Sequence, residues 1–251
     1  MKVSRREFVN TAGCAAAAGL CALPSFGFAA VSDPDARISA GCTLLDLESN
    51  CALPESLAGM RTALGGEYRR VAEIAFDGTD SVVVVPAAGA VQAETFDTVR
   101  NLIEHGTTVL WESGAAFLEP SDFARQQALT LEHFGVSMVQ PIDVWSRSAS
   151  RRLSAEAKNQ SARNVRAIGH ERVPYVEFRW PRETRIRDFS RAIPVSAAKG
   201  QAIAHWGEIP IAWRKSLGAG TLIFVGSPIG PALYCGDTDA ASLFSAMTAA
   251  T

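Results

Sequence analysis

The sequence predicts an α/β fold in which helices flank a mostly parallel open sheet. Residues 81–85 (Ser-Val-Val-Val-Val) form a continuous β-branched run, which is typical of a strand buried on both faces in a parallel sheet. Residues 95–105 place four apolar side chains on one helical stripe, and a glycine ends the helix. Residues 107–111 are predicted as the next strand, so the three segments form a βαβ unit with a right-handed crossover.

The other elements follow from similar patterns. We expect strands at 38–47 and 70–76, and helices at 54–64, 121–134 and 239–250. Residues 209–214 and 221–225 are predicted as a hairpin, since Leu217-Gly218-Ala219-Gly220 has the composition of a tight turn. With 251 residues, 47% of them hydrophobic, the chain is long enough to bury one good core. We therefore expect residues 30–251 to form a single domain.

The first residues predict export. Ser4-Arg5-Arg6-Glu7-Phe8-Val9 resembles the S-R-R-x-F-L signature of twin-arginine signal peptides, and a mildly apolar stretch rich in Ala and Gly follows. Pro24 interrupts that stretch, which argues against a membrane anchor, and Gly27 and Ala29 suit cleavage after Ala29. We expect residues 1–29 to be recognised by the twin-arginine export machinery. The mature chain, without a membrane span, is then expected to be periplasmic or secreted.

A basic segment interrupts a chain whose formal net charge is −2. Between residues 146 and 191, twelve Lys or Arg face five acidic residues, and part of the segment alternates as a β-hairpin does. We interpret it as an excursion from the sheet, part loop and part hairpin. Arg179, Arg182 and Arg185 are the candidates for binding an acidic partner or an anionic glycan. The alternative is a solvated face whose arginines pair with nearby acids.

Cysteine and histidine spacing indicates neither a metal site nor a cofactor. Cys42 and Cys51 could form a disulfide in an oxidising compartment and leave Cys235 unpaired, but buried free thiols fit the same pattern. The four histidines lack the spacing of metal ligands. Nucleic acid is not expected as a partner, because the motifs of nucleic-acid-binding families are absent.

Three segments together resemble the class I glutamine amidotransferase-like family, whose sheet is of flavodoxin type. They are the strand and loop at 82–89, the strand at 106–111 and the stretch 210–227 with its Gly-Ser ending. Active members of that family carry a nucleophilic Cys on a strand-to-helix elbow, whereas Glu112-Ser113-Gly114 follows the strand here. The resemblance therefore implies a non-catalytic member without glutaminase activity.

Open α/β sheets bind ligands beyond the carboxyl ends of their strands. By this rule, the expected ligand-binding residues are Gly89, Glu112, Ser113, Gly226 and Ser227. The alternative is a cleft filled by the protein's own side chains.

The expected function is that of an exported, non-catalytic amidotransferase-like domain that binds a partner protein or a small ligand. The alternative is a periplasmic hydrolase of an ester, an amide or a glycan. Such a hydrolase would use a carboxylate, or Ser113 activated by His205 or His170 with Glu112 behind it.

Overall fold

The computed structural model describes residues 42–47, 50–65, 69–71, 81–144, 175–188 and 191–249. All of these residues belong to one compact unit, Arg37–Thr251. The predicted signal peptide and most of the basic segment lie outside the described residues. Within the described residues, no helix combines the length and the apolar character needed to cross a bilayer.

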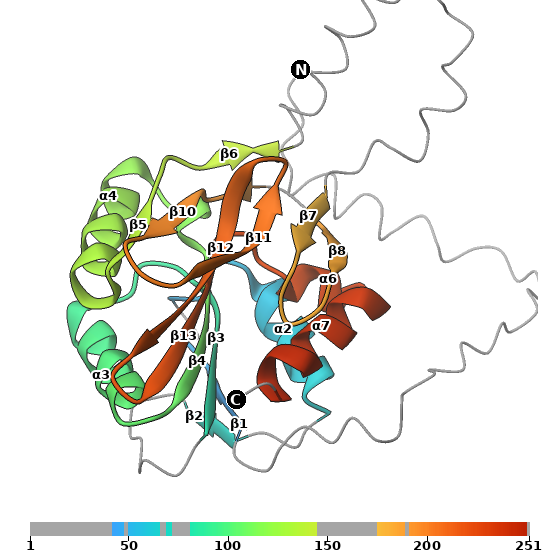
Figure 1. Ribbon diagram of the computed structural model, residues 1–251, viewed down its shortest axis with the longest axis horizontal. Helices are drawn as coiled ribbons and strands as arrows, with labels where there is room; N and C mark the ends of the chain where they lie inside the picture. Colours follow the sequence, from blue (N-terminus) through green and yellow to red (C-terminus); the bar gives the residue numbers. More distant parts are fainter. Residues whose placement is uncertain are drawn as a thin grey trace, which may run out of the picture. The chain divides into compact units, whose positions relative to one another are not determined.

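A nine-stranded sheet forms the centre of the described part of the chain (Figure 1). Its strand order is β2-β1-β3-β4-β13-β12-β11-β7-β8. The first five strands run parallel: β2 (Arg69–Val71), β1 (Cys42–Leu45), β3 (Val82–Ala88), β4 (Thr108–Ser113) and β13 (Gly220–Val225). The last four pair antiparallel with their neighbours: β12 (Ile209–Leu217), β11 (Gln201–Trp206), β7 (Tyr175–Phe178) and β8 (Thr184–Arg187).

The expectation of a mostly parallel open sheet is therefore wrong, because the sheet is mixed. The turn after β12 brings that strand back along β13, and the antiparallel pairing then continues through β11, β7 and β8. The β-hairpin expected within residues 146–191 is present as β7 and β8, but these strands belong to the main sheet and not to an excursion from it. Phe178 and Glu177 of β7 pair with Ala204 and His205 of β11, so the hairpin forms the outer edge of the main sheet.

Helices cover both faces of the sheet (Figure 1). α3 (Ala93–Glu104) and α4 (Pro120–Leu129) pack on one face, and α2 (Pro54–Ala63), α6 (Gly230–Tyr234) and α7 (Thr238–Ala249) on the other. The valines of β3 alternate between the two cores, as the period of a strand requires. Val83 and Val85 join the core with Phe96 of α3, and Val82 and Val84 join the core with α2, α6 and α7.

Shorter elements complete the described part of the chain. β10 (Val195–Ala197) pairs with β5 (Val136–Met138), and β6 (Ile142–Asp143) pairs with β9 (Arg191–Ala192). A 3₁₀ turn, η2 (Ala115–Phe117), follows β4. The single helix expected at 121–134 is instead α4 followed by a π-helical segment, η3 (Thr130–Phe134).

Candidate functional site

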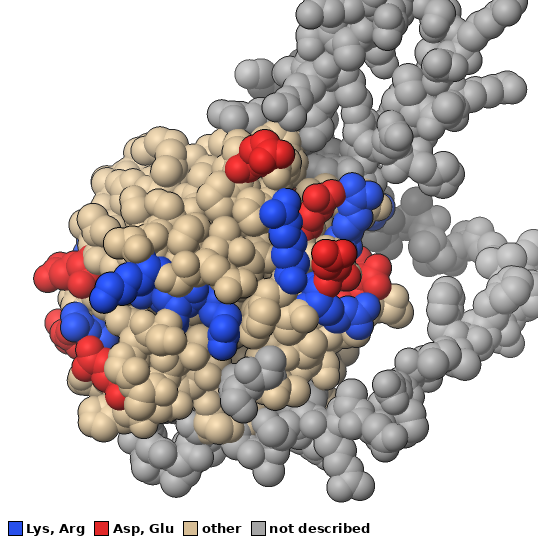
Figure 2. Space-filling model, in the orientation of Figure 1, with Lys and Arg blue, Asp and Glu red and all other residues tan. Residues whose placement is uncertain are grey.

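A groove of about 580 Å³ lies at the outer edge of the sheet, where the β7–β8 hairpin meets the start of α7. We call it the hairpin groove. Most of its lining is charged, and it consists of Glu177, Phe178, Arg179, Arg182, Glu183, Thr184, Arg185 and Asp239. Acidic and basic side chains intermingle over this part of the surface (Figure 2). The three arginines predicted to bind a partner are thus brought together, together with acids that the sequence did not single out as site residues.

Cross-strand pairing accounts for two of the charges in the hairpin groove. Glu177 of β7 stands opposite Arg185 of β8. The guanidinium of Arg185 contacts the Glu177 carboxylate twice, with Nη2 to Oε1 at 2.6 Å and Nε to Oε1 at 3.1 Å. Glu177 and Arg185 therefore neutralise each other, as the solvated-face alternative expected for this region.

Two other arginines of the groove have different surroundings. Arg182 donates a hydrogen bond to the hydroxyl of Ser242 on α7, which is a neutral partner. Arg179 lies in an exposed position just after β7, and no ion pair joins its guanidinium to a residue in the described part of the chain. Both cations therefore keep their charge toward the groove and solvent.

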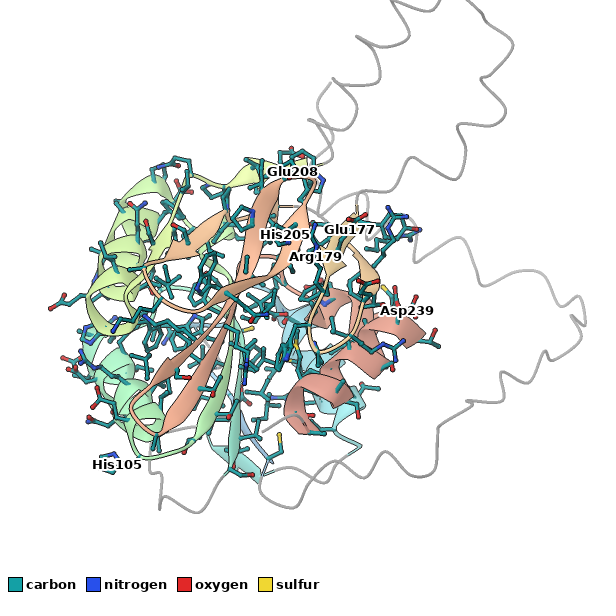
Figure 3. All side chains as sticks on the ribbon, viewed as in Figure 1. His105, Glu177, Arg179, His205, Glu208 and Asp239 are labelled. Atoms are coloured by element: carbon teal, nitrogen blue, oxygen red, sulfur yellow. The ribbon has the colours of Figure 1, made fainter. Side chains whose placement is uncertain are left out.

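His205 does not line the hairpin groove, but it interacts electrostatically with two residues that do. It stands opposite Glu177 in the β11–β7 ladder, and Figure 3 shows it beside Arg179. Burial lowers the pKa of His205, and the positive charge of Arg179 lowers it further, while Glu208 and Glu177 oppose the change. Its Nδ1 atom is buried without a hydrogen-bond partner among the described residues. The surroundings of His205 therefore favour its neutral form.

The remaining acids of the groove come from two separate elements. Glu183 lies in the turn of the β7–β8 hairpin, and Asp239 lies in the first turn of α7. Asp237 fixes that end of the helix, since its Oδ1 accepts hydrogen bonds from the backbone N–H groups of Asp239 (2.9 Å) and Ala240 (3.0 Å). Both Glu183 and Asp239 are exposed, so a ligand in the groove can reach them.

At the carboxyl ends of the parallel strands, the structure brings the predicted ligand-binding residues close together but fully buries Glu112. Its Oε1 accepts hydrogen bonds from the backbone N–H of Ile229 (2.5 Å) and Gly230 (2.9 Å). Its Oε2 accepts from the N–H of Ala87 (2.9 Å) and from the hydroxyl of Ser56. Burial raises the pKa of Glu112, and these four hydrogen bonds counteract the rise.

The other four predicted ligand-binding residues are also buried. Ser113 contacts the sulfur of Met138 at 3.9 Å, and the hydroxyl of Ser227 donates to Asp188 at 2.7 Å. Gly89 and Gly226 lie so close to neighbouring backbone that a Cβ would meet a carbonyl oxygen at 2.7 Å and 2.3 Å, respectively. Ligand binding at this edge of the sheet stays a prediction.

The structure does not assemble the serine hydrolase predicted as an alternative. No hydrogen bond joins Ser113 to a histidine in the described part of the chain, and the side chain of Ser113 is buried. His170 lies outside the described residues. Glu112 does not orient a histidine for Ser113, because its carboxylate accepts hydrogen bonds from Ser56, Ala87, Ile229 and Gly230. A serine nucleophile therefore has no support from the geometry.

The described residues include three cysteines and no cluster suited to a metal ion. Within the described part of the chain, no disulfide joins Cys42, Cys51 or Cys235, with Cys42 buried in β1 and Cys235 exposed. Of the two alternatives for Cys42 and Cys51, the structure has the one without a disulfide. No group of three or more His, Cys, Asp or Glu in the described ranges is arranged to hold a metal ion.

Comparisons place this fold among known structures. No family model matches the chain, and no curated protein matches it. The cold-adapted β-galactosidase from Rahnella sp. R3 matches with a TM-score of 0.56 and 12% identity, over 84% of this chain and 31% of that chain. The exo-β-1,4-mannosidase Op5Man5 from Opitutaceae bacterium strain TAV5 matches with a TM-score of 0.52 and 11% identity, over 85% of this chain and 35% of that chain. The α-L-fucosidase isoenzyme 2 from Paenibacillus thiaminolyticus matches with a TM-score of 0.53 and 10% identity, over 82% of this chain and 32% of that chain.

These comparisons overturn the expected resemblance to the class I glutamine amidotransferase-like family, and with it the function of a non-catalytic domain of that family. The matching structures are glycosidases by name. The motifs at 82–89 and 106–111 do not distinguish one family from another, because an apolar strand followed by small residues is found in many buried parallel sheets. The chain spans about a third of the length of the glycosidases it matches. What it shares with part of those enzymes is the fold.

Proposed function

We propose that this chain hydrolyses glycosidic bonds and that the hairpin groove is where the glycan binds. The observation that carries the proposal is the placement of two accessible carboxylates, Glu183 and Asp239, in one groove from two different elements. Most glycoside hydrolases work with such a pair, in which one carboxylic acid protonates the leaving oxygen and one carboxylate activates water or attacks the sugar. The names of the matching structures favour the same chemistry.

The third carboxylate of the groove is suited to a different role. Glu177 forms an ion pair with Arg185, so its carboxylate is less available for proton transfer than those of Glu183 and Asp239. It supports the proposal in another way, because a carboxylate fixed by a cross-strand arginine can accept hydrogen bonds from sugar hydroxyls without moving. We therefore assign Glu183 and Asp239 to the reaction and Glu177 to substrate binding.

The buried carboxylate at the strand ends does not compete with this assignment. Glu112 accepts four hydrogen bonds and has no exposed surface, so a glycosidic oxygen cannot reach it. Its role is to hold the elements around it together.

The proposal is tested by assaying the mature chain against a panel of plant and bacterial polysaccharides, with reducing-end release as the readout. We expect release from at least one polysaccharide, and a loss of at least about a hundredfold in kcat for Glu183→Gln or Asp239→Asn. Glu132→Gln is the matched control, because Glu132 is an exposed carboxylate on η3 outside the groove. Activity that survives the double substitution Glu183→Gln/Asp239→Asn would contradict the proposal, as would the absence of release from every polysaccharide.

We further propose that the protein works outside the cytoplasm, since its first residues resemble a twin-arginine signal. Cell fractionation of the tagged full chain tests this. We expect the protein in the periplasm or medium, and its retention in the cytoplasm when Arg5 and Arg6 are both changed to Lys. Lys2→Gln is the control, because it alters the charge of the same segment but leaves both arginines. Equal export of the double variant would contradict this proposal.

A further inference from the structure

We infer that the hairpin groove selects glycans that carry anionic groups, carboxylate or sulfate, and that Arg179 and Arg182 bind those groups. The inference rests on the proposed function, because it assumes that the groove takes a glycan. It starts from the charges of the lining, which consist of three arginines and three acids. Equal numbers give no net charge, so selectivity must come from how the charges are paired and placed.

The pairing leaves two arginines available to a ligand. Arg185 is neutralised by Glu177 at 2.6 Å. Arg182 contacts the uncharged hydroxyl of Ser242, and Arg179 has no ion-pair partner in the described ranges. An arginine without a carboxylate partner can offer its planar set of N–H donors to the two oxygens of a ligand carboxylate or to a sulfate.

The placement of the charges gives the groove two ends. Arg179 is close enough to His205 on β11 for its charge to lower the pKa of that imidazole. Asp239 belongs to α7, and Figure 3 shows it apart from the group of Arg179, His205 and Glu177. Arg182 donates to Ser242 on the same helix as Asp239, so each end of the groove has an arginine without a carboxylate partner among the described residues. The acidic groups of a glycan can then face Arg179 and Arg182, while its hydroxyls face the carboxylates.

His205 does not compete with Arg179 for an anionic ligand, because burial and the charge of Arg179 both lower its pKa and so favour its uncharged form. No carboxylate forms an ion pair with Arg179 in the described ranges, so a ligand does not have to displace one. Binding then depends on Arg179 and Arg182 themselves, and this dependence makes the inference testable by substitution.

The experiment measures binding of the full mature chain to three glycans by isothermal titration calorimetry: polygalacturonate, chondroitin sulfate and a neutral galactan. We expect the two anionic glycans to bind more tightly than galactan. Arg179→Gln/Arg182→Gln should weaken anionic binding by roughly tenfold or more, and weaken it more than it weakens galactan binding. Arg100→Gln is the control, because Arg100 is a half-exposed arginine on α3 that pairs with Glu104 outside the groove.

The outcomes separate this inference from the proposed function. If galactan binds as well as the anionic glycans, and the double variant binds all three as the wild type does, the inference is wrong while hydrolysis in the groove stands. If no glycan binds and none is hydrolysed, the proposed function fails and the inference fails with it. Tight binding of polygalacturonate alone identifies the ligand group as carboxylate. Tight binding of chondroitin sulfate that unsulfated chondroitin does not reproduce identifies it as sulfate, since both polymers carry the glucuronate carboxylate.

Discussion

Ser56, in the first turns of α2, donates its hydroxyl hydrogen bond to the buried carboxylate of Glu112 at the end of β4, 56 residues further along the chain. The same carboxylate accepts the backbone N–H of Ala87, at the end of β3, and those of Ile229 and Gly230 at the start of α6. One side chain thus joins four segments at the carboxyl edge of the sheet. We conclude that Glu112 stabilises the fold at the place where sequence patterns predicted a ligand.

Removing the hydroxyl of Ser56 should destabilise the protein. In Ser56→Ala, the Glu112 carboxylate keeps its three backbone N–H donors but loses the hydroxyl donor, in a site that water cannot reach. A hydrogen bond to a charged group contributes roughly 1.5–3 kcal/mol to stability. We expect the free energy of unfolding, measured by urea titration, to fall by about that amount. Thr62→Ala is the control, since Thr62 is exposed on the same helix. Equal stabilities of the two variants would contradict the role given to Ser56.

Glu112 should also make stability depend on pH in a definite direction. Burial raises the pKa of Glu112 above its ordinary value of 4.5, so the folded state keeps a proton that the unfolded chain has already lost. The free energy of unfolding then decreases as pH rises through the window above 4.5, because the folded state binds more protons there.

Glu112→Gln has no titrating group at this position, and it places amide hydrogens against backbone N–H donors. It should be less stable than the wild type by roughly 2–6 kcal/mol, from two buried donors left without an acceptor. The difference between the two proteins should shrink as pH is raised from about 4 to about 7 in urea unfolding experiments. A difference that grows with pH would show that the four hydrogen bonds outweigh burial.

Close backbone contact between α2 and α6 predicts the effect of a single methyl group. A Cβ on Gly59 would lie 2.0 Å from the carbonyl oxygen of Gly230 and 2.6 Å from the N–H nitrogen of Tyr234. Gly59→Ala gains up to about 1 kcal/mol in helix propensity, but overpacking of a rigid contact costs roughly 1–3 kcal/mol or more. We expect a net loss of stability in thermal unfolding, in contrast to Ala substitutions at exposed α2 positions. A variant more stable than the wild type would show that the two helices can separate at no cost.

The neutral state of His205 can be measured directly. Because burial and Arg179 lower its pKa, an NMR titration of the imidazole should give a midpoint below 6.5. Below that value the unfolded chain gains a proton that the folded state resists, so His205 lowers stability as pH falls. Arg179→Gln should move the midpoint upward. A midpoint at or above 6.5 in the wild type would contradict the lowered pKa, and a midpoint that Arg179→Gln leaves unchanged would contradict the electrostatic link to Arg179.

Local patterns predicted the individual elements better than they predicted the sheet. The expected helices at 54–64, 95–105 and 239–250 are confirmed as α2, α3 and α7, since each has a clear apolar stripe or a clear stop. The strand β11 was missed because Gln201, Ala202 and His205 give it no clean alternation. Without β11, nothing connects the β7–β8 hairpin to β12, and the antiparallel half of the sheet could not be assembled from the sequence.

The candidate site shows a similar division between local and long-range information. The sequence singled out Arg179, Arg182 and Arg185 within an alternating segment, and the structure places all three in the groove lining together with Glu177. Asp239 was not predicted as a site residue, because its approach to the hairpin depends on how α7 packs against β8. Glu112 was predicted to line a pocket because its position at a strand end is visible in the sequence, whereas the four donors that bury it come from distant segments.

The ion pair between Glu177 and Arg185 gives a last prediction that connects stability with binding. Both side chains are substantially exposed, Arg185 by 69% and Glu177 by 42%. Exposed pairs of this kind contribute under about 1 kcal/mol, so a double-mutant cycle with Glu177→Gln and Arg185→Gln should give a small coupling energy that decreases with added salt. The effect on the groove should be larger than the effect on folding, because Glu177→Gln leaves a third arginine without a carboxylate partner.

The Gln side chain keeps an oxygen that can accept from sugar hydroxyls but removes the negative charge. Glu177→Gln should therefore bind polygalacturonate more tightly than the wild type, by a few-fold at low ionic strength, while its melting temperature changes little. Calorimetric titration at two salt concentrations measures the gain, and Arg185→Gln provides the comparison, since it removes the cation and frees the anion. If Arg185→Gln strengthens anionic binding as much as Glu177→Gln does, the sign of the groove charge has no influence on the ligand. Arg179 and Arg182 would then bind through contacts other than the charge of a carboxylate or sulfate group.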